Sequence, residues 1–219
     1  MSSSTKPHGP RRRDAEATRE ALLRAATELF ALLGYDGVRV EAVARRAGVN
    51  KALINYYFGG KRPLYRAAIE SSFREIHRLA QQLRDRSRAP DELIRGFIDG
   101  FADLARDRRP HFPALFMRET LSTGELAPEA TEHIGSILEA FREVLGRGRR
   151  QKVFRKVDPA QVYLYLVGSL AFFFATAPAR EQLAKKRRLP MVSPSPDRYV
   201  AFVRDALSRV LTARTGDFQ

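Results

Sequence analysis

The chain has 219 residues, of which 44% are hydrophobic, and its 39 Lys and Arg against 25 Asp and Glu give a formal net charge of +14. This composition is ordinary for a soluble globular protein of one large or two smaller domains, and the charge favours a polyanionic partner, nucleic acid before an anionic membrane surface. The sequence contains no cysteine, which excludes disulfides, thiolate metal sites and cysteine nucleophiles and is consistent with a reducing cytoplasm.

The N-terminal segment, residues 1–13, is polar and ends in three arginines. We expect a disordered basic arm here and no signal peptide, because the segment has no apolar run. The arginines could enter a DNA minor groove, but we favour a solubilising tail that attracts phosphate without sequence preference. From Asp14, apolar residues at three- and four-residue steps predict a helix that ends at Gly34.

Two short predicted helices follow. Val40–Gly48 has the apolar spacing of a short helix, and its final glycine supplies a tight turn. Asn50 is a residue type that caps helices, and it predicts a third helix of about seven residues that Gly59 and Gly60 end. Two short helices joined at a glycine turn form a helix-turn-helix, whose second helix lies in the major groove of DNA.

The second helix of this motif carries the candidate base-contacting residues. These are Asn50, Lys51, Ala52, Leu53 and Asn55. An asparagine amide can bridge the N6/N7 edge of adenine, and a lysine can reach the O6/N7 edge of guanine. Leu53 could contact a thymine methyl group or could pack inward.

Lys61 and two tyrosines are candidate phosphate contacts. Lys61 follows two glycines at the start of the next predicted helix, where outward-pointing amides attract phosphate. Tyr56 and Tyr57 could donate their hydroxyls to phosphates, which would position the helix without reading sequence. The structural alternative is that Tyr57 and Phe58 belong to the core and that the lysines are merely solvated. The net charge favours the DNA-binding interpretation.

The segment GYDGVRVEAVARRAGVNKALINYYFGGKRPLY, residues 34–65, resembles the DNA-binding signature of the tetracycline-repressor-like (TetR) family of bacterial transcriptional regulators. The shared residues are GY at 34–35, VA at 43–44, AGV at 47–49, YYF at 56–58, K at 61 and LY at 64–65. The resemblance implies that residues 50–57 face DNA and that Tyr57 and Lys61 hold phosphates. Two residues depart from the family pattern. Arg39 replaces a frequent threonine, so it could meet a phosphate but cannot cap the second helix, and Asn55 replaces a usual aromatic residue.

The rest of the chain is also expected to be helical, so the predicted fold class is all-α. Segments GRGRRQKVFRKVD (146–158) and KKRRLPMVSPSPD (185–197) have the composition of exposed basic connectors. The predicted helices are 61–86, 91–108, 112–121, 128–145, 159–177 and 197–213. With the resemblance, this gives a helix-turn-helix DNA-binding domain at 14–60 and a larger helical domain for effector binding and dimerisation at 61–219.

The apolar helix at 162–177 predicts a subunit interface. Its three consecutive phenylalanines, 172–174, cannot share one direction at about 100° per residue. A helix that is apolar nearly all round must be covered nearly all round, so the domain interior would cover one side and a second subunit the other. The apolar stripe at 199–210 would complete a four-helix interface. The alternative is that both helices pack only within one chain.

The resemblance also implies a small effector. A pocket for an apolar or aromatic compound would be lined by aromatic residues of 112–117 and 163–174, with His111, Arg118 and Glu119 as candidate polar anchors. Because aromatic residues at helical spacing more often form core, we assign no ligand-binding residues.

We predict that the protein is a sequence-specific DNA-binding transcriptional regulator. The favoured form is a ligand-responsive homodimeric repressor. It would act in the cytoplasm and bind a palindromic operator in double-stranded DNA. We predict no catalytic residue, cofactor or metal, because the four histidines, His8, His77, His111 and His133, lack metal-ligand spacing. An enzyme is the second hypothesis, since catalytic triads need no fixed order along a chain. A protein on the surface of anionic membranes is the third. The apolar run 162–177 is shorter than the roughly 20 residues that span a bilayer, so we predict no membrane partner.

Overall fold

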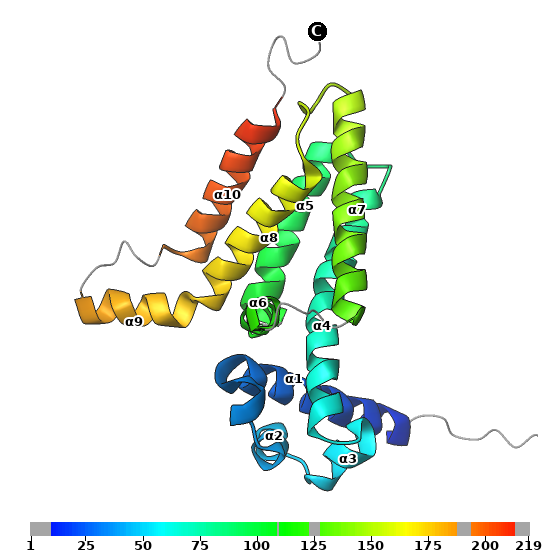
Figure 1. The fold of residues 1–219 in the computed structure, drawn as a ribbon, viewed down its shortest axis with the longest axis vertical. Helices are drawn as coiled ribbons and strands as arrows, with labels where there is room; N and C mark the ends of the chain where they lie inside the picture. The colour runs from blue at the N-terminus through cyan, green and yellow to red at the C-terminus, as the bar shows by residue number, and fades with distance from the viewer. Residues whose placement is uncertain (1–9, 109, 123–127, 188–193, 213–219) are drawn as a thin grey trace, which may run out of the picture. The chain divides into compact units, whose positions relative to one another are not determined.

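The computed structural model describes residues 10–108, 110–122, 128–187 and 194–212, and these residues are almost entirely helical (Figure 1). No β-strand forms among them, although an isolated antiparallel bridge pairs Phe154 with Thr212. The predicted all-α class is therefore confirmed. The predicted arm lies mostly outside the described residues.

The chain divides into two compact units, with the boundary between Ile69 and Glu70. The N-terminal unit contains α1 (Pro10–Gly37), α2 (Val40–Ala47), α3 (Ala52–Phe58) and the start of α4 (Lys61–Gln81). The sequence assigns DNA binding to residues 14–60 and effector binding with dimerisation to residues 61–219. These functional assignments stay predictions.

Helix α1 differs from its prediction at both ends. It begins at Pro10, four residues before the expected start, because a proline is tolerated in the first turn of a helix. It was expected to end at Gly34. Instead, hydrogen bonding continues to Gly37, and Gly34 forms a kink with φ 72° and ψ 176°. The glycine therefore breaks the helix direction where predicted but does not end the element.

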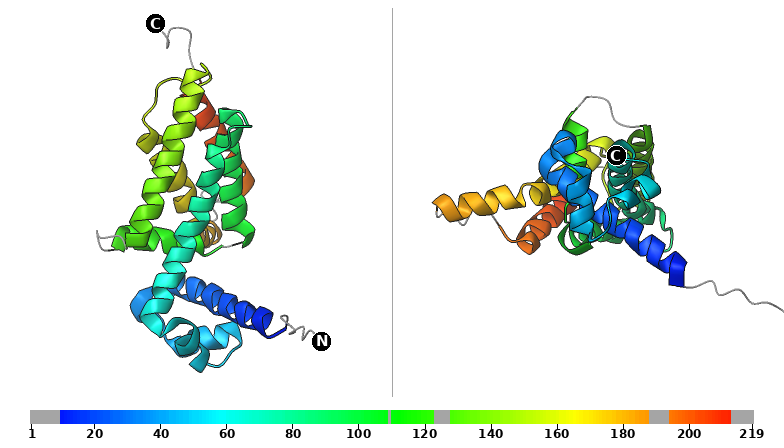
Figure 2. Two further views of the ribbon diagram at one scale, coloured as in Figure 1. Left: turned by 90° about the vertical axis from the view of Figure 1, so that its right-hand side faces the viewer. Right: turned by 90° about the horizontal axis from the view of Figure 1, so that it is seen from below.

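The C-terminal unit contains the rest of α4 and six further α-helices (Figure 2) among the described residues. The helices are α5 (Pro90–Asp103), α6 (Phe112–Ser122), α7 (Pro128–Arg150), α8 (Pro159–Ala175), α9 (Ala177–Arg187) and α10 (Pro196–Leu211), with a 3-10 turn at Gln82–Arg84 and a π-helical turn at Leu104–Arg108. Aromatic rings fill the core: Phe97 packs edge-on against Phe141, and Phe101 against Phe112.

Local capping explains where several of these helices begin. Proline occupies the first helical position of α5, α8 and α10, where its missing N–H costs no hydrogen bond. The Asp158 carboxylate accepts a 2.8 Å bond from the Ala160 amide, and Ser195 accepts from the Arg198 amide at 3.4 Å. Both residues therefore satisfy an amide that the first turn leaves open.

The two predicted connectors are partly wrong. The segment 185–197 was expected to be exposed connector, but residues 185–187 end α9, a helix that the sequence did not predict separately. The segment 146–158 begins inside α7, which continues to Arg150, and Phe154 is buried with 3% of its surface exposed. Gly146 and Gly148 therefore lie inside the helix, and Gly148 packs against the Phe154 ring.

Gly148 lies directly beneath the Phe154 ring. A Cβ atom at residue 148 would lie 2.1 Å from the ring carbon Cδ2, whereas a Cβ atom at Gly135 of the same helix would meet nothing within 4 Å. We expect Gly148→Ala to destabilise the protein by about 1–3 kcal/mol, because the buried ring must move. We expect Gly135→Ala to be neutral or stabilising by up to about 1 kcal/mol. Denaturant unfolding of both variants checks this, and equal stabilities would contradict the packing.

No single helix in the described part of the chain is both long enough and apolar enough to cross a membrane. Helices α8 and α9 meet the length and composition criteria only as a pair, and they are bent by 53° at the break between them.

Candidate nucleic-acid interface

The turn between α2 and α3 has the geometry of a helix-turn-helix. Gly48 ends α2 in the left-handed region, with φ 71° and ψ 29°, which a residue with a side chain adopts at a cost. Its amide donates to the Arg45 carbonyl at 3.2 Å, and the Val49 amide donates to the Ala44 carbonyl at 3.0 Å. At the other end of α2, Arg39 is extended and makes no side-chain cap, as the sequence comparison with threonine predicted.

Asn50 lies in the turn before α3, two residues ahead of Ala52. Its side-chain Oδ1 accepts a 2.8 Å hydrogen bond from the Ala52 amide, so its predicted capping role is confirmed. A bidentate contact to adenine needs both the oxygen and the NH₂ group. Asn50 and Asn55 are both exposed, but the Asn50 oxygen already accepts a hydrogen bond from the protein, so we favour Asn55 for that contact.

Helix α3 buries one side chain and exposes its polar ones. Ile54 is the buried residue of the helix, with 1% of its surface exposed, whereas Tyr56 is 79% exposed. Leu53 and Tyr57 are half-buried, so each has one part against the protein and one part outward. Phe58, expected to be buried, is half-buried. The helix thus lies on the unit through Ile54 and presents Asn55 and Tyr56 to solvent.

Lys51 is paired with a residue that the sequence interpretation missed. Its Nζ lies 3.2 Å from Oε1 of Glu41 on α2. The backbone amide of Glu41 itself and the Lys51 ammonium hydrogen-bond to this carboxyl and hold its pKa below the ordinary value. The pair is exposed and therefore exchangeable, so Lys51 can leave Glu41 for a DNA acceptor. Glu41 and Lys51 are ten residues apart in the sequence, so no local pattern indicated this contact.

A second ion pair ties α2 to α1. The Arg46 guanidinium donates from Nε to Oε2 of Glu28 at 2.9 Å and from Nη2 to Oε1 at 3.1 Å. This bidentate arrangement raises the pKa of Arg46 through hydrogen bonding and charge. It links the first helix of the motif to α1 at the surface of the N-terminal unit.

Lys61 lies at the start of α4, against an aromatic cluster. Its Nζ is 4.4 Å from the centroid of the Tyr35 ring, a cation–π distance. The Tyr35 ring contacts both Phe30 and Tyr65, with centroid separations of 6.3 and 5.1 Å. Lys61 is therefore not simply solvated. Its charge is held beside the first turn of α4, where helix amides also favour an anion. Tyr35 belongs to the GY pair of the sequence signature, but only the fold shows its partner.

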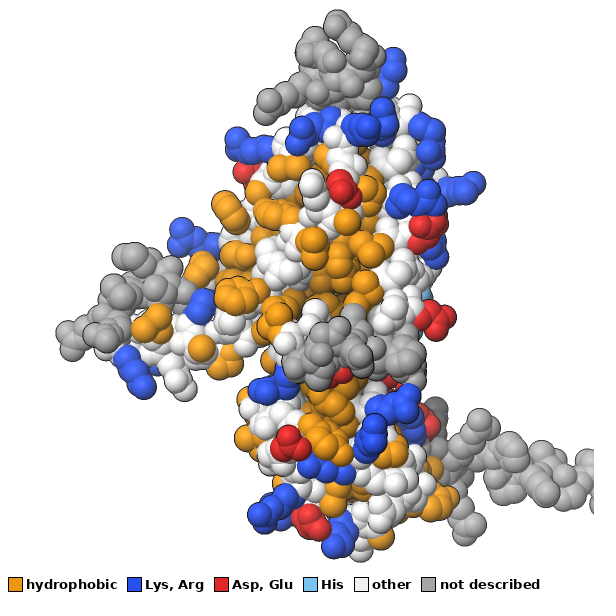
Figure 3. Space-filling view, in the orientation of Figure 1, with side chains coloured by type: hydrophobic (Ala, Val, Ile, Leu, Met, Phe, Trp, Pro, Cys, Tyr) orange, Lys and Arg blue, Asp and Glu red, His pale blue; other side chains and the backbone are white. Residues whose placement is uncertain are grey.

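Basic side chains gather around this surface. In the lower part of Figure 3, Lys and Arg side chains lie on the face of the N-terminal unit where Figure 1 draws α2 and α3. The nine predicted site residues are all exposed or half-buried. Asn50 and Lys51 lie in the turn before α3, Ala52, Leu53, Asn55, Tyr56 and Tyr57 lie on α3, and Lys61 begins α4. Arg39 lies apart from these in the sequence, immediately before the N-terminal residue of α2.

Comparison with known proteins connects this geometry to a family. Residues 22–68 match the family model described as bacterial regulatory proteins, tetR family, and residues 90–189 match a tetracyclin repressor-like C-terminal domain. HTH-type transcriptional regulator BetI 1 of Chromohalobacter salexigens is 31% identical over an alignment 171 residues long, which covers 70% of this chain and 79% of that protein. The chain belongs to the TetR family.

Two further comparisons agree with this assignment. HTH-type transcriptional repressor NicS of Pseudomonas putida is 27% identical over 175 residues, 78% of this chain and 81% of that protein. The crystal structure of a TetR family transcription regulator from Marinobacter aquaeolei has the same fold, with a TM-score of 0.70 at 15% identity, covering 94% of this chain and all of that one. The chain is thus a DNA-binding transcriptional regulator, and the similar proteins named here are regulators rather than enzymes.

Proposed function

We propose that the protein is a homodimeric repressor that binds a palindromic operator in double-stranded DNA and releases it when a small apolar or aromatic effector binds. The observation that carries the DNA-binding part is the exposed polar face of α3, which Ile54 holds on the N-terminal unit. A regulator of this kind acts where the chromosome is, so we infer a cytoplasmic location. The similarity to a protein named as a repressor supports repression rather than activation of transcription.

The proposed DNA contacts divide into two classes. Asn55 and Lys51 would contact base edges in the major groove, with Leu53 and Ala52 against thymine methyl groups. Positioning contacts to phosphates would come from Arg39, Asn50, Tyr56, Tyr57 and Lys61. In this arrangement Lys51 exchanges the Glu41 carboxylate for a base acceptor, at little cost because the pair is exposed.

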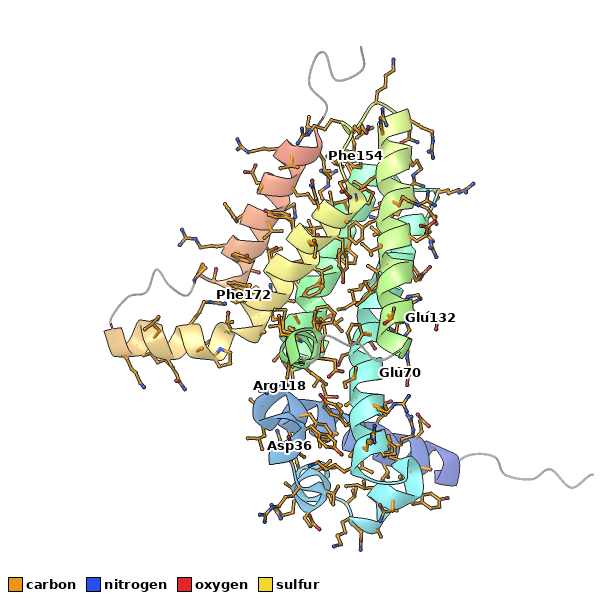
Figure 4. The ribbon with its side chains drawn as sticks, in the orientation of Figure 1. Asp36, Glu70, Arg118, Glu132, Phe154 and Phe172 are labelled. Atoms are coloured by element: carbon orange, nitrogen blue, oxygen red, sulfur yellow. The ribbon has the colours of Figure 1, made fainter. Side chains whose placement is uncertain are left out.

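A dimer interface is proposed on α8 and α10. Leu164 and Phe172 of α8 are 67% and 59% exposed, and Phe202 of α10 is 63% exposed. Figure 3 shows apolar side chains gathered where Figure 1 draws these helices, and Figure 4 labels Phe172 there. Large exposed apolar patches mark interaction sites, and a second copy would present the same two stripes in a self-complementary interface. Regulators of this family act as dimers, which supports this assignment.

The exposures on α8 agree with the sequence argument. Phe172 is exposed, Phe173 is buried and Phe174 is half-buried, as three different directions require. Gly168 lies between Leu164 and Phe172 along the helix, and a Cβ atom there would meet nothing within 4 Å, so another helix could approach closely.

Effector control is proposed for the aromatic core of the C-terminal unit. Phe112, Phe116 and Phe173 are buried, so in the described structure these residues serve as core. Burial raises the pKa of Tyr163 to about 12, which keeps its hydroxyl neutral beside Phe141. A ligand would weaken DNA binding only by preferring the conformation that binds DNA poorly. Melting temperature and operator affinity, measured across a set of aromatic compounds, test this part.

The decisive experiment for the function is selection of bound sequences from random duplex DNA. A palindromic consensus supports a symmetric dimer that reads one half-site per subunit. A consensus without symmetry would contradict the palindromic operator, and enrichment of no sequence would contradict specific recognition.

Single substitutions should then separate the two classes of contact. We expect Lys61→Ala to weaken binding on every sequence and to lower the salt slope by about one unit per subunit, because one phosphate contact is lost. We expect Asn55→Ala to reduce discrimination at one base pair of each half-site by about 1–3 kcal/mol. Binding across a salt series, on the operator and its single-base variants, measures both effects.

Lys156→Ala is the matched control, because it removes the same charge from an exposed residue of the C-terminal unit. An equal change in salt slope for Lys156→Ala and Lys61→Ala would show a general charge effect and contradict the phosphate contact. Unchanged base preference in Asn55→Ala would move the specificity to other residues or to DNA deformability.

A further inference from the structure

Glu41 lies beside a residue that is proposed to contact bases. It belongs to the first turn of α2, and its Oε1 is 3.2 Å from Nζ of Lys51, which immediately precedes α3. Both side chains are exposed, Glu41 by 49% and Lys51 by 65%. The N-terminal residues of a recognition helix are those that contact base edges in the major groove. The Glu41 carboxylate therefore lies on the surface where Lys51 would meet DNA.

A carboxylate on this surface needs a hydrogen-bond donor from the DNA. When Lys51 moves to a base acceptor, Glu41 loses the ammonium that it contacts and lies near phosphates of its own charge. An ionised carboxylate only accepts hydrogen bonds. The donors in the major groove are the amino groups at N4 of cytosine and N6 of adenine, so one of these two groups would have to meet Glu41.

The spacing of the two charges matches one base pair. In a G·C pair, guanine O6 accepts a Watson–Crick hydrogen bond from cytosine N4, so these two atoms are about 2.9 Å apart. Nζ of Lys51 and Oε1 of Glu41 are 3.2 Å apart. The ammonium can therefore donate to guanine O6 and N7 while the carboxylate accepts the second N4 proton of the paired cytosine. Each charge then has a partner on the same base pair.

The other base pairs match this arrangement less well. An A·T pair also places a donor beside an acceptor, but thymine offers lysine one oxygen with a methyl group beside it, whereas guanine offers two acceptors. A C·G pair presents the same groups in reverse order, so the ammonium would face the amino group and the carboxylate would face the guanine oxygen. The two side chains together should therefore distinguish G·C from both alternatives.

We propose that Glu41 is a specificity-determining residue that reads one G·C base pair of each half-site together with Lys51. The lysine contacts the guanine, and the Glu41 carboxylate contacts the cytosine of the same pair. This role rests on the proposed contact between Lys51 and a base, and it adds a base contact from α2 to those of α3. In the simpler alternative, Glu41 only competes with DNA for Lys51 and has no influence on base preference.

The test measures binding of the full chain to short duplexes that carry the selected consensus and every single-base-pair change of one half-site. We expect one G·C pair whose replacement by A·T or C·G weakens binding at least about tenfold. Glu41→Ala should lower that preference at least about fivefold and leave the preferences at other base pairs unchanged. Lys51→Ala should lower the preference at the same base pair, because both side chains contact it.

Asp36→Ala is the matched control, because it removes the same charge from an exposed residue of the N-terminal unit, labelled in Figure 4. It should change the affinity for all duplexes by the same factor. An equally uniform change in Glu41→Ala would show that Glu41 only repels DNA or competes for Lys51, and would refute the base contact.

Two further results would overturn the role of Glu41. One is a loss of preference at different base pairs in Glu41→Ala and Lys51→Ala, and the other is a preference for A·T at the pair that both variants affect. Neither result contradicts the proposed function, which fails instead if the unmodified chain selects no sequence from random DNA.

Discussion

Replacing Phe202 with glutamate should convert the protein from a dimer to a monomer at micromolar concentration. Phe202 is 63% exposed on the single chain, whereas Val203 and Leu207 of the same helix are buried within the chain. In the proposed interface, the substitution would bury a carboxylate against its symmetry mate without a partner, and an unpaired buried charge is strongly unfavourable. The folded chain itself should lose little stability, because this side chain contributes little to the core.

The same variant should lose most of its operator affinity although it leaves α3 untouched. A dimer makes its second half-site contact intramolecularly, and removal of such a link lowers overall affinity by about 10²–10⁴-fold. Sedimentation or light scattering gives the mass, and titration of operator DNA gives the affinity. Leu121→Glu is the matched control, since Leu121 is also an exposed apolar residue, on α6 outside the two stripes. A dimeric Phe202→Glu, or a monomeric unmodified chain, would refute the interface.

Replacing Ile54 with alanine should abolish DNA binding on all sequences without removing a DNA contact. Ile54 is the buried residue of a seven-residue helix, too short to be stable by itself, so its packing holds α3 in place. Truncation of a buried isoleucine to alanine costs about 2–5 kcal/mol. Because the chain has two compact units, this loss should appear as faster amide hydrogen exchange in the N-terminal unit rather than as a uniform change.

Tyr56→Ala provides the contrast to Ile54→Ala. Tyr56 is 79% exposed, so its loss should change stability by no more than about 0.5 kcal/mol while weakening operator binding. Hydrogen exchange resolved by peptide, together with operator titration, distinguishes a folding defect from a lost contact. If amides of the N-terminal unit are equally protected against hydrogen exchange in the two variants, Ile54 does not hold α3 in place.

Local sequence was sufficient for the boundaries of the helix-turn-helix. Gly48 takes a left-handed conformation and Asn50 caps the next helix, as their residue types predicted. Both features depend on backbone conformation and on hydrogen bonds spanning two to five residues, so neighbouring residues suffice to specify them. The alternating exposure of Phe172 and Phe173 followed in the same way from the helical period.

Glycines of α7 show where local rules failed. The helix predicted at 128–145 continues through Gly146 and Gly148 to Arg150, and the Phe154 ring occupies the space that a side chain at residue 148 would take. Helix α9 was missed for a related reason, since its short, strongly basic sequence has no clear apolar period. In both cases the residue types were compatible with more than one local structure, and packing selected among them.

The sequence by itself determined the all-α class, the helix-turn-helix spacing and the residues available on α3 for DNA, because these follow from short-range periodicity and a dense signature. Only the tertiary structure decided which charges are already paired. Lys51 meets Glu41 across ten residues, Arg46 meets Glu28 across eighteen, and Arg204 meets Asp99 across 105. Such contacts depend on how whole helices pack, and no local pattern in the chain encodes a distance between residues so far apart.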